Sequence, residues 1–184
     1  MSLHGANVTG IDIEDHLLAV AKARQKLLED YIKKPLPCKF IKKSLLDVDS
    51  KEKFDIIWIE QAFHHLEPRK KMLDKISELV NKDGYIVISE ANAWNPLNQL
   101  RVLKLRGFNT IIEHAGHTWG HERILPPITL KKELNKRGIK AVSVRYFRVL
   151  PNIDIANKIG FIDKMIPKCF FPLFTHYNYV GKKL

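Results

Sequence analysis

A group of polar side chains follows the most apolar strand-like stretch of the sequence. The run at residues 56–59 leads directly into Glu60 and Gln61, and His64 and His65 come three residues later. Carboxylate and imidazole groups are the side chains that most often exchange protons with a reacting molecule. The spacing therefore marks residues 60–65 as a candidate site. The alternative is a buried strand that simply runs into a polar loop.

The position of this group depends on the strand that precedes it. Four consecutive apolar residues, one of them Trp58, predict a strand that is buried on both faces, as in a parallel sheet. In open α/β sheets, ligands bind just beyond the carboxyl ends of such strands. The sequence thus predicts that Glu60, Gln61 and the two histidines lie where a ligand would bind.

The rest of the chain supplies the other elements of an α/β fold. Apolar runs bounded by turn residues predict strands at residues 8–13, 38–41, 54–60, 85–90, 141–149 and 175–180. Helical spacing of apolar residues predicts helices at residues 14–34, 68–80, 97–106 and 129–138. Helical crossovers favour parallel pairing, whereas the last strand is expected to be antiparallel because no long helix precedes it. A turn is expected at residues 81–84, with Gly84 at a positive φ.

Composition limits the class of protein. The 184 residues suffice for one domain with a core, and no stretch of about 18 uncharged apolar residues predicts a membrane span. Cys38 and Cys169 are far apart and form no CxxC motif, which fits a reducing compartment. With no secretory signal pattern at the N-terminus, the sequence predicts a cytoplasmic protein.

The charge is strongly basic but dispersed. Lys and Arg outnumber Asp and Glu by 31 to 20, which gives a net charge of +11. The basic residues are not interleaved with aromatic residues, and no nucleic-acid-binding motif occurs, so nucleic acid is not an expected partner. Anionic substrates or acidic membrane surfaces remain alternatives.

Residues 92–127 differ in character from the rest of the chain: after the helix predicted at residues 97–106, residues 114–123 have neither helical nor strand periodicity. The segment contains Trp94, His117, Trp119 and His121, which are the candidate substrate-binding residues of an inserted lid or acceptor-binding segment. Its histidines loosely imitate the spacing of metal ligands. Glycines between them argue against one rigid helix, so no metal is predicted.

The tail at residues 159–174 is apolar and interrupted by lysines; its phenylalanine, isoleucine and methionine residues include Phe161, Ile162, Met165, Ile166, Phe170, Phe171 and Phe174. We expect it to form core or a pocket wall. A basic amphipathic surface for a lipid-like acceptor or for peripheral membrane contact is the alternative.

Several motifs, in this order and spacing, resemble those of the class I S-adenosylmethionine-dependent methyltransferases of the small-molecule group. The motifs are residues 8–14, residues 54–57 with 63–66, and residues 79–90. The resemblance implies a Rossmann-like methyltransferase sheet, mostly parallel with an antiparallel C-terminal strand, in a single domain over residues 1–184. It also implies transfer of a methyl group from S-adenosylmethionine to a small-molecule or lipid-like acceptor. The alternative is a catalytically inactive binding or regulatory module with the same fold.

The resemblance also assigns roles to residues. Asp12 corresponds to the acid that holds the ribose hydroxyls, and a carboxylate suits two vicinal hydroxyls. Where the family usually has an acid beside the adenine, this sequence has Ser44. The implied cofactor-binding residues are Asp12, Ile13, Ser44, Leu45, Glu60 and Gln61. His64 and His65 are the candidate catalytic residues, with packing or capping histidines as the alternative; a base is needed only if the acceptor must lose a proton.

One expected motif is missing from this sequence. The resemblance calls for a strand and a Gly-rich loop before Val8, and no GxGxG occurs. We therefore expect an N-terminally truncated methyltransferase. The strands that end at Asp12 and Glu60 should pair directly or take a strand from another chain, for example in a homo-oligomer. Cofactor binding by these residues alone should be weak or absent.

Overall fold

The computed structural model describes residues 1–100, 125–149 and 165–184. The chain forms two compact units, Met1–Glu52 and Lys53–Leu184. Among the residues described, no helix is both long and apolar enough to cross a membrane.

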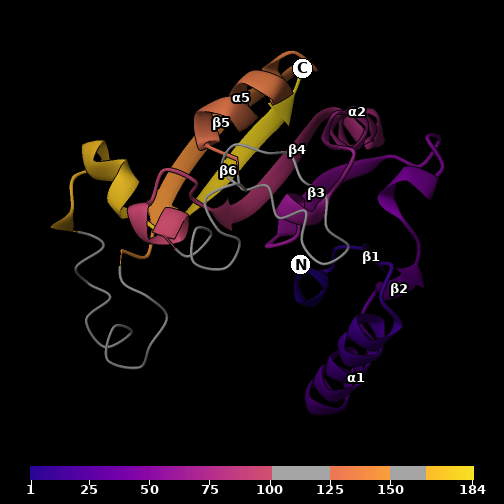
Figure 1. The fold of residues 1–184 in the computed structure, drawn as a ribbon. Helices are drawn as coiled ribbons and strands as arrows, with labels where there is room; N and C mark the ends of the chain where they lie inside the picture. Colours follow the sequence, from indigo (N-terminus) through magenta and orange to yellow (C-terminus); the bar gives the residue numbers. More distant parts are fainter. Residues whose placement is uncertain (101–124, 150–164) are drawn as a thin grey trace. The chain divides into compact units, whose positions relative to one another are not determined.

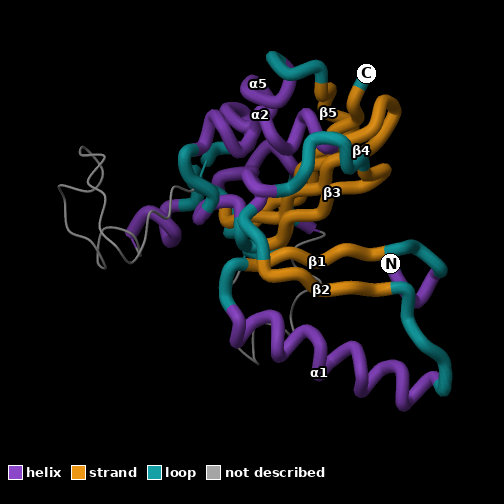
Figure 2. The backbone as a smooth tube through the Cα atoms, turned by 90° about the vertical axis from the view of Figure 1, so that its right-hand side faces the viewer, coloured by secondary structure: helices purple, strands orange, loops and turns teal. Residues whose placement is uncertain are grey.

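The first unit consists of two parallel strands and one helix (Figure 2). After a short 3-10 turn at Ser2–His4, strand β1 (Val8–Asp12) leads into helix α1 (Asp15–Ile32) and strand β2 (Cys38–Lys42). The two strands pair in parallel register from Val8 opposite Cys38 to Asp12 opposite Lys42. Because parallel strands end at the same edge of their sheet, the residues after Asp12 and after Lys42 lie at one edge.

The second unit contains a four-stranded sheet in the order β3-β4-β6-β5 (Figure 1). Its elements are β3 (Phe54–Glu60), the 3-10 turn η3 (Phe63–His65), α2 (Arg69–Leu79), β4 (Val80–Ala91), α5 (Pro127–Asn135), β5 (Ile139–Phe147), the 3-10 segment η4 (Lys168–Leu173) and β6 (His176–Lys183). Strands β3 and β4 are parallel, and β6 is antiparallel to both of its neighbours. The predicted α/β class, with an antiparallel C-terminal strand, is confirmed.

Helices α2 and α5 cover the same face of this sheet (Figure 2). The α2 face that the sequence predicts to be apolar is buried in its core. The fully buried apolar side chains of the unit are Phe63, Leu73, Ile76, Leu79, Ile86, Ile88, Leu130, Leu134, Ile139, Tyr177 and Tyr179. This core fixes the carboxyl ends of β3 and β4 against the turn η3.

The turn expected at residues 81–84 is wrong in its detail. These residues are part of β4, which bulges there because its pairing with β3 jumps from Val80 to Tyr85. The positive φ, 64°, belongs to Asp83, and Gly84 has none. Gly84 is needed for space instead: a Cβ there would lie 2.9 Å from the carbonyl oxygen of Asn81 and 3.0 Å from that of Asp55.

Other boundaries differ by small amounts. Helix α5 begins at Pro127, two residues before the predicted Thr129, because proline suits the first turn of a helix. The helix predicted at residues 97–106 is described only to residue 100, and residues 96–100 are helical.

Of the two expected alternatives for β1 and β3, the described residues show no direct pairing, and a strand taken from another chain stays a prediction. The two strands are edges of separate sheets, and no hydrogen-bonded ladder joins them. Among the described residues, β3 pairs with β4 on one side only. Its Ile56 and Trp58 side chains are about half exposed, so the predicted burial of this strand on both faces is wrong.

Candidate functional site

The first unit brings two of the predicted cofactor-binding pairs to one sheet edge. Asp12 ends β1, and Ser44 follows β2 by two residues. The Lys43 amide donates to the Asp12 carbonyl oxygen over 3.0 Å, which continues the ladder beyond the strands. Asp12, Ile13, Ser44 and Leu45 therefore stay near one another.

The side chains at this edge keep groups free for a ligand. Asp12 Oδ1 accepts a hydrogen bond from the Glu14 amide at 2.9 Å, and no described residue bonds to Oδ2. Ser44 Oγ accepts from the Leu46 amide at 3.3 Å, so its hydroxyl proton can still be donated. Ile13 is 62% exposed and offers an apolar surface beside the acid. This donor and acceptor set fits a nucleoside, whose ribose hydroxyls donate to a carboxylate.

In the second unit, Glu60 and Gln61 lie at the carboxyl end of β3, as predicted. Both side chains are exposed. The Gln61 backbone has a φ of 49°, in the left-handed region, and its amide donates to the Ser89 carbonyl oxygen of β4 over 2.9 Å. The chain therefore leaves the sheet abruptly after Glu60, which turns the following residues back over the end of β4.

Glu90 is the central residue of this turn. Its side chain is only 2% exposed, and it lies near the end of β4. One carboxylate oxygen accepts from the Phe63 amide at 2.7 Å and from the His64 amide at 3.4 Å. The other carboxylate oxygen lies 2.8 Å from His64 Nδ1. Glu90 thus fixes both the backbone of η3 and the imidazole of His64.

Arg69 contacts the residues on both sides of His64 in the chain. Its guanidinium carbon lies 4.8 Å from the centre of the Phe63 ring, in a cation–π arrangement. Its Nε donates to the Leu66 carbonyl oxygen at 3.2 Å, and it forms an ion pair with Glu67 at 3.2 Å. The turn from Phe63 to Arg69 is therefore tied at both ends.

Tyr177 shows how enclosed this region is. The pKa of its phenol is raised well above its usual range, first by burial and then by the charge of Glu90. Its hydroxyl donates to the Leu125 carbonyl oxygen at 3.2 Å. His65, in contrast, is exposed, and its ring centre lies 4.0 Å from that of His64. The two predicted catalytic histidines are thus adjacent but differ in burial.

Three asparagines after β4 bind the segment that precedes β6. They are spaced three residues apart, and their side-chain amides donate to main-chain carbonyl oxygens. Asn92 donates to Phe171 and Phe174, Asn95 to Pro172 and Leu173, and Asn98 to Asn92 and Thr175, over 2.7–3.1 Å. We call these three residues the asparagine clasp. The clasp fixes η4 against the loop that carries Trp94.

Trp94 is the predicted substrate-binding residue that the structure describes. It is 46% exposed, and its ring meets that of Phe171 edge-on, with 6.0 Å between the centroids. The ring centroid of Tyr146 lies 5.5 Å from that of Phe171. The predicted residues His117, Trp119 and His121 lie outside the described residues. Within the described ranges, no three potential metal ligands gather into one group.

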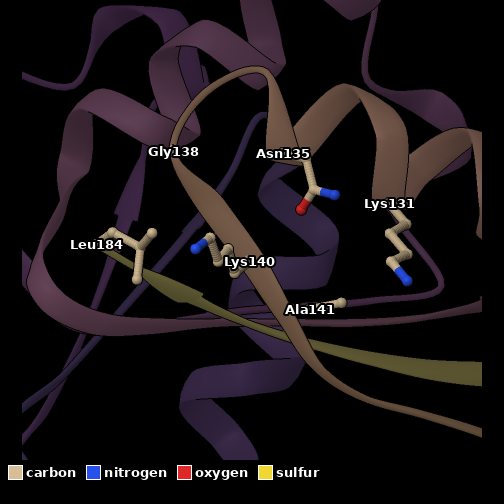
Figure 3. Close-up of a pocket in the computed structure, with 6 residues that line it drawn as sticks. All are labelled: Lys131, Asn135, Gly138, Lys140, Ala141 and Leu184. Atoms are coloured by element: carbon tan, nitrogen blue, oxygen red, sulfur yellow. The ribbon is translucent and has the colours of Figure 1, made fainter.

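A surface cavity of about 370 Å³ lies elsewhere (Figure 3). It is at the opposite end of the sheet from Glu90, because its residue Lys140 pairs with Lys182, which in turn pairs with Tyr85. It is lined by Lys131, Asn135, Gly138, Lys140, Ala141 and Leu184. The two lysine ammonium groups do not converge on a common point (Figure 3). We therefore place the candidate site at the carboxyl ends of the strands and not in this cavity.

Two features of the site were not singled out from the sequence. In the sequence, Glu90 is an acid near the end of a predicted strand. Its contact with His64 cannot be predicted without knowing that β3 pairs with β4. The asparagine clasp does leave a signal, which is the repetition of asparagine at residues 92, 95 and 98 immediately after a predicted strand.

Comparison with known proteins agrees with this geometry. Residues 1–86 match the family model of a methyltransferase domain. A search of curated proteins found no significant match.

Several solved structures share the fold. A magnesium protoporphyrin IX methyltransferase from Synechocystis PCC 6803 with bound SAH aligns with a TM-score of 0.65 at 12% identity. The alignment covers 100% of this chain and 67% of the Synechocystis chain. A SAM-dependent methyltransferase from Methanosarcina mazei aligns with a TM-score of 0.67 at 14% identity. The alignment covers 100% of this chain and 84% of the Methanosarcina chain. The N-methyltransferase NodS from Bradyrhizobium japonicum WM9 aligns with a TM-score of 0.59 at 13% identity. The alignment covers 95% of this chain and 72% of the NodS chain.

At these identities the likeness establishes the fold. This chain spans 67% of the Synechocystis enzyme in its SAH-bound structure and 62% in its SAM-bound structure. Residues 1–86 match the model of a methyltransferase domain, and the chain shares the fold of solved S-adenosylmethionine-dependent methyltransferases, in agreement with the resemblance found in the sequence.

Proposed function

We propose that the protein transfers a methyl group from S-adenosylmethionine to a small-molecule or lipid-like acceptor. The observation that carries the proposal is the placement of polar side chains at the carboxyl ends of the strands, in a chain whose first 86 residues match a methyltransferase domain. Ligands of open α/β sheets bind at these ends.

Cofactor contacts are proposed for each unit separately. In the first unit, Asp12 would accept from the ribose hydroxyls, and Ser44 and Leu45 would contact the adenine. In the second unit, Glu60 and Gln61 would face the methionine portion. The bound cofactor supplies an electrophilic methyl group on a sulfonium, and the protein's contribution is to hold donor and acceptor in line.

The acceptor would bind to the segment at residues 92–127 and the aromatic residues near η4. Support comes from Trp94, which is half exposed beside Phe171 on a loop held by the asparagine clasp. The magnesium protoporphyrin IX methyltransferase and the N-methyltransferase among the structural neighbours act on acceptors of different chemistry. The acceptor class must therefore be read from this chain's own residues.

The competing function is a binding or regulatory module without catalysis. The same fold can be kept without the activity. Both functions predict affinity for the cofactor, whereas only the first predicts methylated product.

Isothermal titration with S-adenosylhomocysteine and with NAD tests the proposal. We expect weak binding of S-adenosylhomocysteine that becomes weaker still in the Asp12→Asn variant, since that change removes a carboxylate charge but preserves shape. Glu14→Gln is the matched control, because it changes an exposed acid two residues away. Tight binding of NAD without any response to S-adenosylhomocysteine would refute the proposal in favour of an oxidoreductase.

A further inference from the structure

We propose that His64, oriented by Glu90, is the base that removes a proton from the methyl acceptor. It follows that the acceptor is a nucleophile that carries a proton on the attacked atom, such as an alcohol, a phenol or an ammonium nitrogen. This inference rests on the proposed function, since it names the acceptor class of the same site.

The geometry fixes the tautomer of His64. A carboxylate can accept hydrogen bonds but cannot donate them. Because a Glu90 carboxylate oxygen lies 2.8 Å from His64 Nδ1, the proton of the neutral imidazole must be on Nδ1. Nε2 then carries a lone pair, which is the form that a base requires.

The other ring nitrogen is available. Within the described part of the chain, His64 Nε2 has no hydrogen-bond partner, and the side chain is 14% exposed. The imidazole is therefore held at Nδ1 by a carboxylate that is 2% exposed, and Nε2 is bonded to none of the described residues. A histidine that served packing alone would not need a buried carboxylate aligned with its Nδ1.

The surrounding groups are consistent with a gain of positive charge at His64. In the described ranges, the titratable and charged groups around it are Glu90 from β4, His65 and Arg69 from its own segment, Glu67 beside Arg69, and Tyr177 from β6. Arg69 is already paired with Glu67. The Glu90 carboxylate can therefore stabilise the imidazolium that forms when Nε2 takes a proton.

The step balances without any further reagent. The acceptor's X–H proton moves to His64 Nε2, and the electron pair of that bond remains on X. This pair forms the new bond to the methyl carbon, and the electron pair of the broken carbon–sulfur bond remains on sulfur. The imidazolium later releases its proton to water. Glu90 is a positioning residue here, since it touches His64 and not the acceptor.

The tautomer can be tested without turnover. Long-range proton–nitrogen NMR of the ¹⁵N-histidine-labelled protein should show His64 protonated on Nδ1, with assignment by loss of its signals in His64→Gln. In Glu90→Gln this preference should be lost, and in Glu90→Asp it should be partly retained. Glu133→Gln, which removes a partly buried acid remote from His64, is the control. A wild-type protein with its proton on Nε2 would overturn the inference, and this result needs no folded variant at Glu90.

Turnover with matched acceptors tests the base itself. A panel of primary amines, alcohols and phenols is compared with tertiary amines and thioethers, which have no proton to lose. For proton-bearing acceptors, kcat in His64→Gln should fall about 10²- to 10⁴-fold, with little change in KM or in affinity for S-adenosylhomocysteine. Turnover of proton-bearing acceptors that is unchanged in His64→Gln, or turnover of proton-free acceptors only, would refute the role of His64 and leave methyl transfer intact. A wild-type protein that fails to bind S-adenosylhomocysteine would refute the proposed function instead.

Discussion

Removing one member of the asparagine clasp should loosen η4 and the strand that follows it. Asn92 is fully buried, and its side chain makes three hydrogen bonds: two donated to Phe171 and Phe174, and one accepted from the Trp94 amide at 3.1 Å. A hydrogen bond contributes about 1 kcal/mol net, so Asn92→Ala should cost about 3 kcal/mol. The Phe174 carbonyl group, which belongs to a residue only 2% exposed, is left with little access to water.

Hydrogen exchange followed by mass spectrometry measures this cost where it arises. A loss of about 3 kcal/mol corresponds to exchange that is about 10²-fold faster in peptides covering residues 168–176, if these amides exchange through local opening. Gln99→Ala is the matched control, because its side chain makes one exposed hydrogen bond to the Ala93 carbonyl oxygen. Surface substitutions change stability by about 0.5 kcal/mol or less, which corresponds to about a threefold change in exchange rate. If the exchange rates of these peptides in Asn92→Ala are within about threefold of those in Gln99→Ala, the clasp does not hold η4.

Three further predictions concern single side chains. Asp12→Asn should weaken binding of S-adenosylhomocysteine by about 10- to 100-fold in calorimetry, since charge-assisted hydrogen bonds contribute about 1.5–3 kcal/mol; an unchanged affinity would place the ribose elsewhere. Gly84→Ala should lower the urea midpoint by the equivalent of about 1–3 kcal/mol, because the added methyl group meets the Asn81 carbonyl oxygen at 2.9 Å; an unchanged midpoint would mean that the bulge yields freely. Burial raises the pKa of Tyr179 to about 12 from an ordinary value of 10.0, so its contribution to stability is complete below pH 10 and is lost as the pH rises towards 12. Tyr179→Phe should remove that alkaline loss without destabilising the protein at neutral pH, since the hydroxyl has no hydrogen-bond partner among the described residues; equal alkaline loss in both proteins would assign it to other groups.

The elements of the fold are largely predictable because local patterns specify them. The apolar run before Glu60 identifies β3, and the apolar face of α2 follows from residue spacing. The bulge in β4 is not predictable in this way. Its residues Asn81 to Gly84 have the composition of a turn, and pairing with β3 on both sides of the bulge keeps them in the strand.

The site is predictable only in part, for a related reason. Glu60, Gln61, His64 and His65 follow from their position after one strand. The role of Glu90 depends on β3 and β4 lying side by side, with Glu60 opposite Ser89, and a single sequence does not contain that register. The clasp likewise joins residues separated by more than 70 positions. Contacts over such distances come from the fold and not from any local pattern.

The sparse interior of the first unit has a consequence for how the protein opens. In residues 1–52, the buried apolar side chains are Leu18 and Val48, whereas Leu27 and Tyr31 of α1 are 70% and 85% exposed. Since chains of this size bury little apolar surface, β1, α1 and β2 should be the first part to unfold locally, at a free energy below that of the second unit. Asp12 and Ser44 lie in this weaker part, so ligand binding and local folding would be linked. A cofactor at 100 times its dissociation constant would add about 2.7 kcal/mol to the free energy of opening at β1, and protection of those amides would then report occupancy of the site.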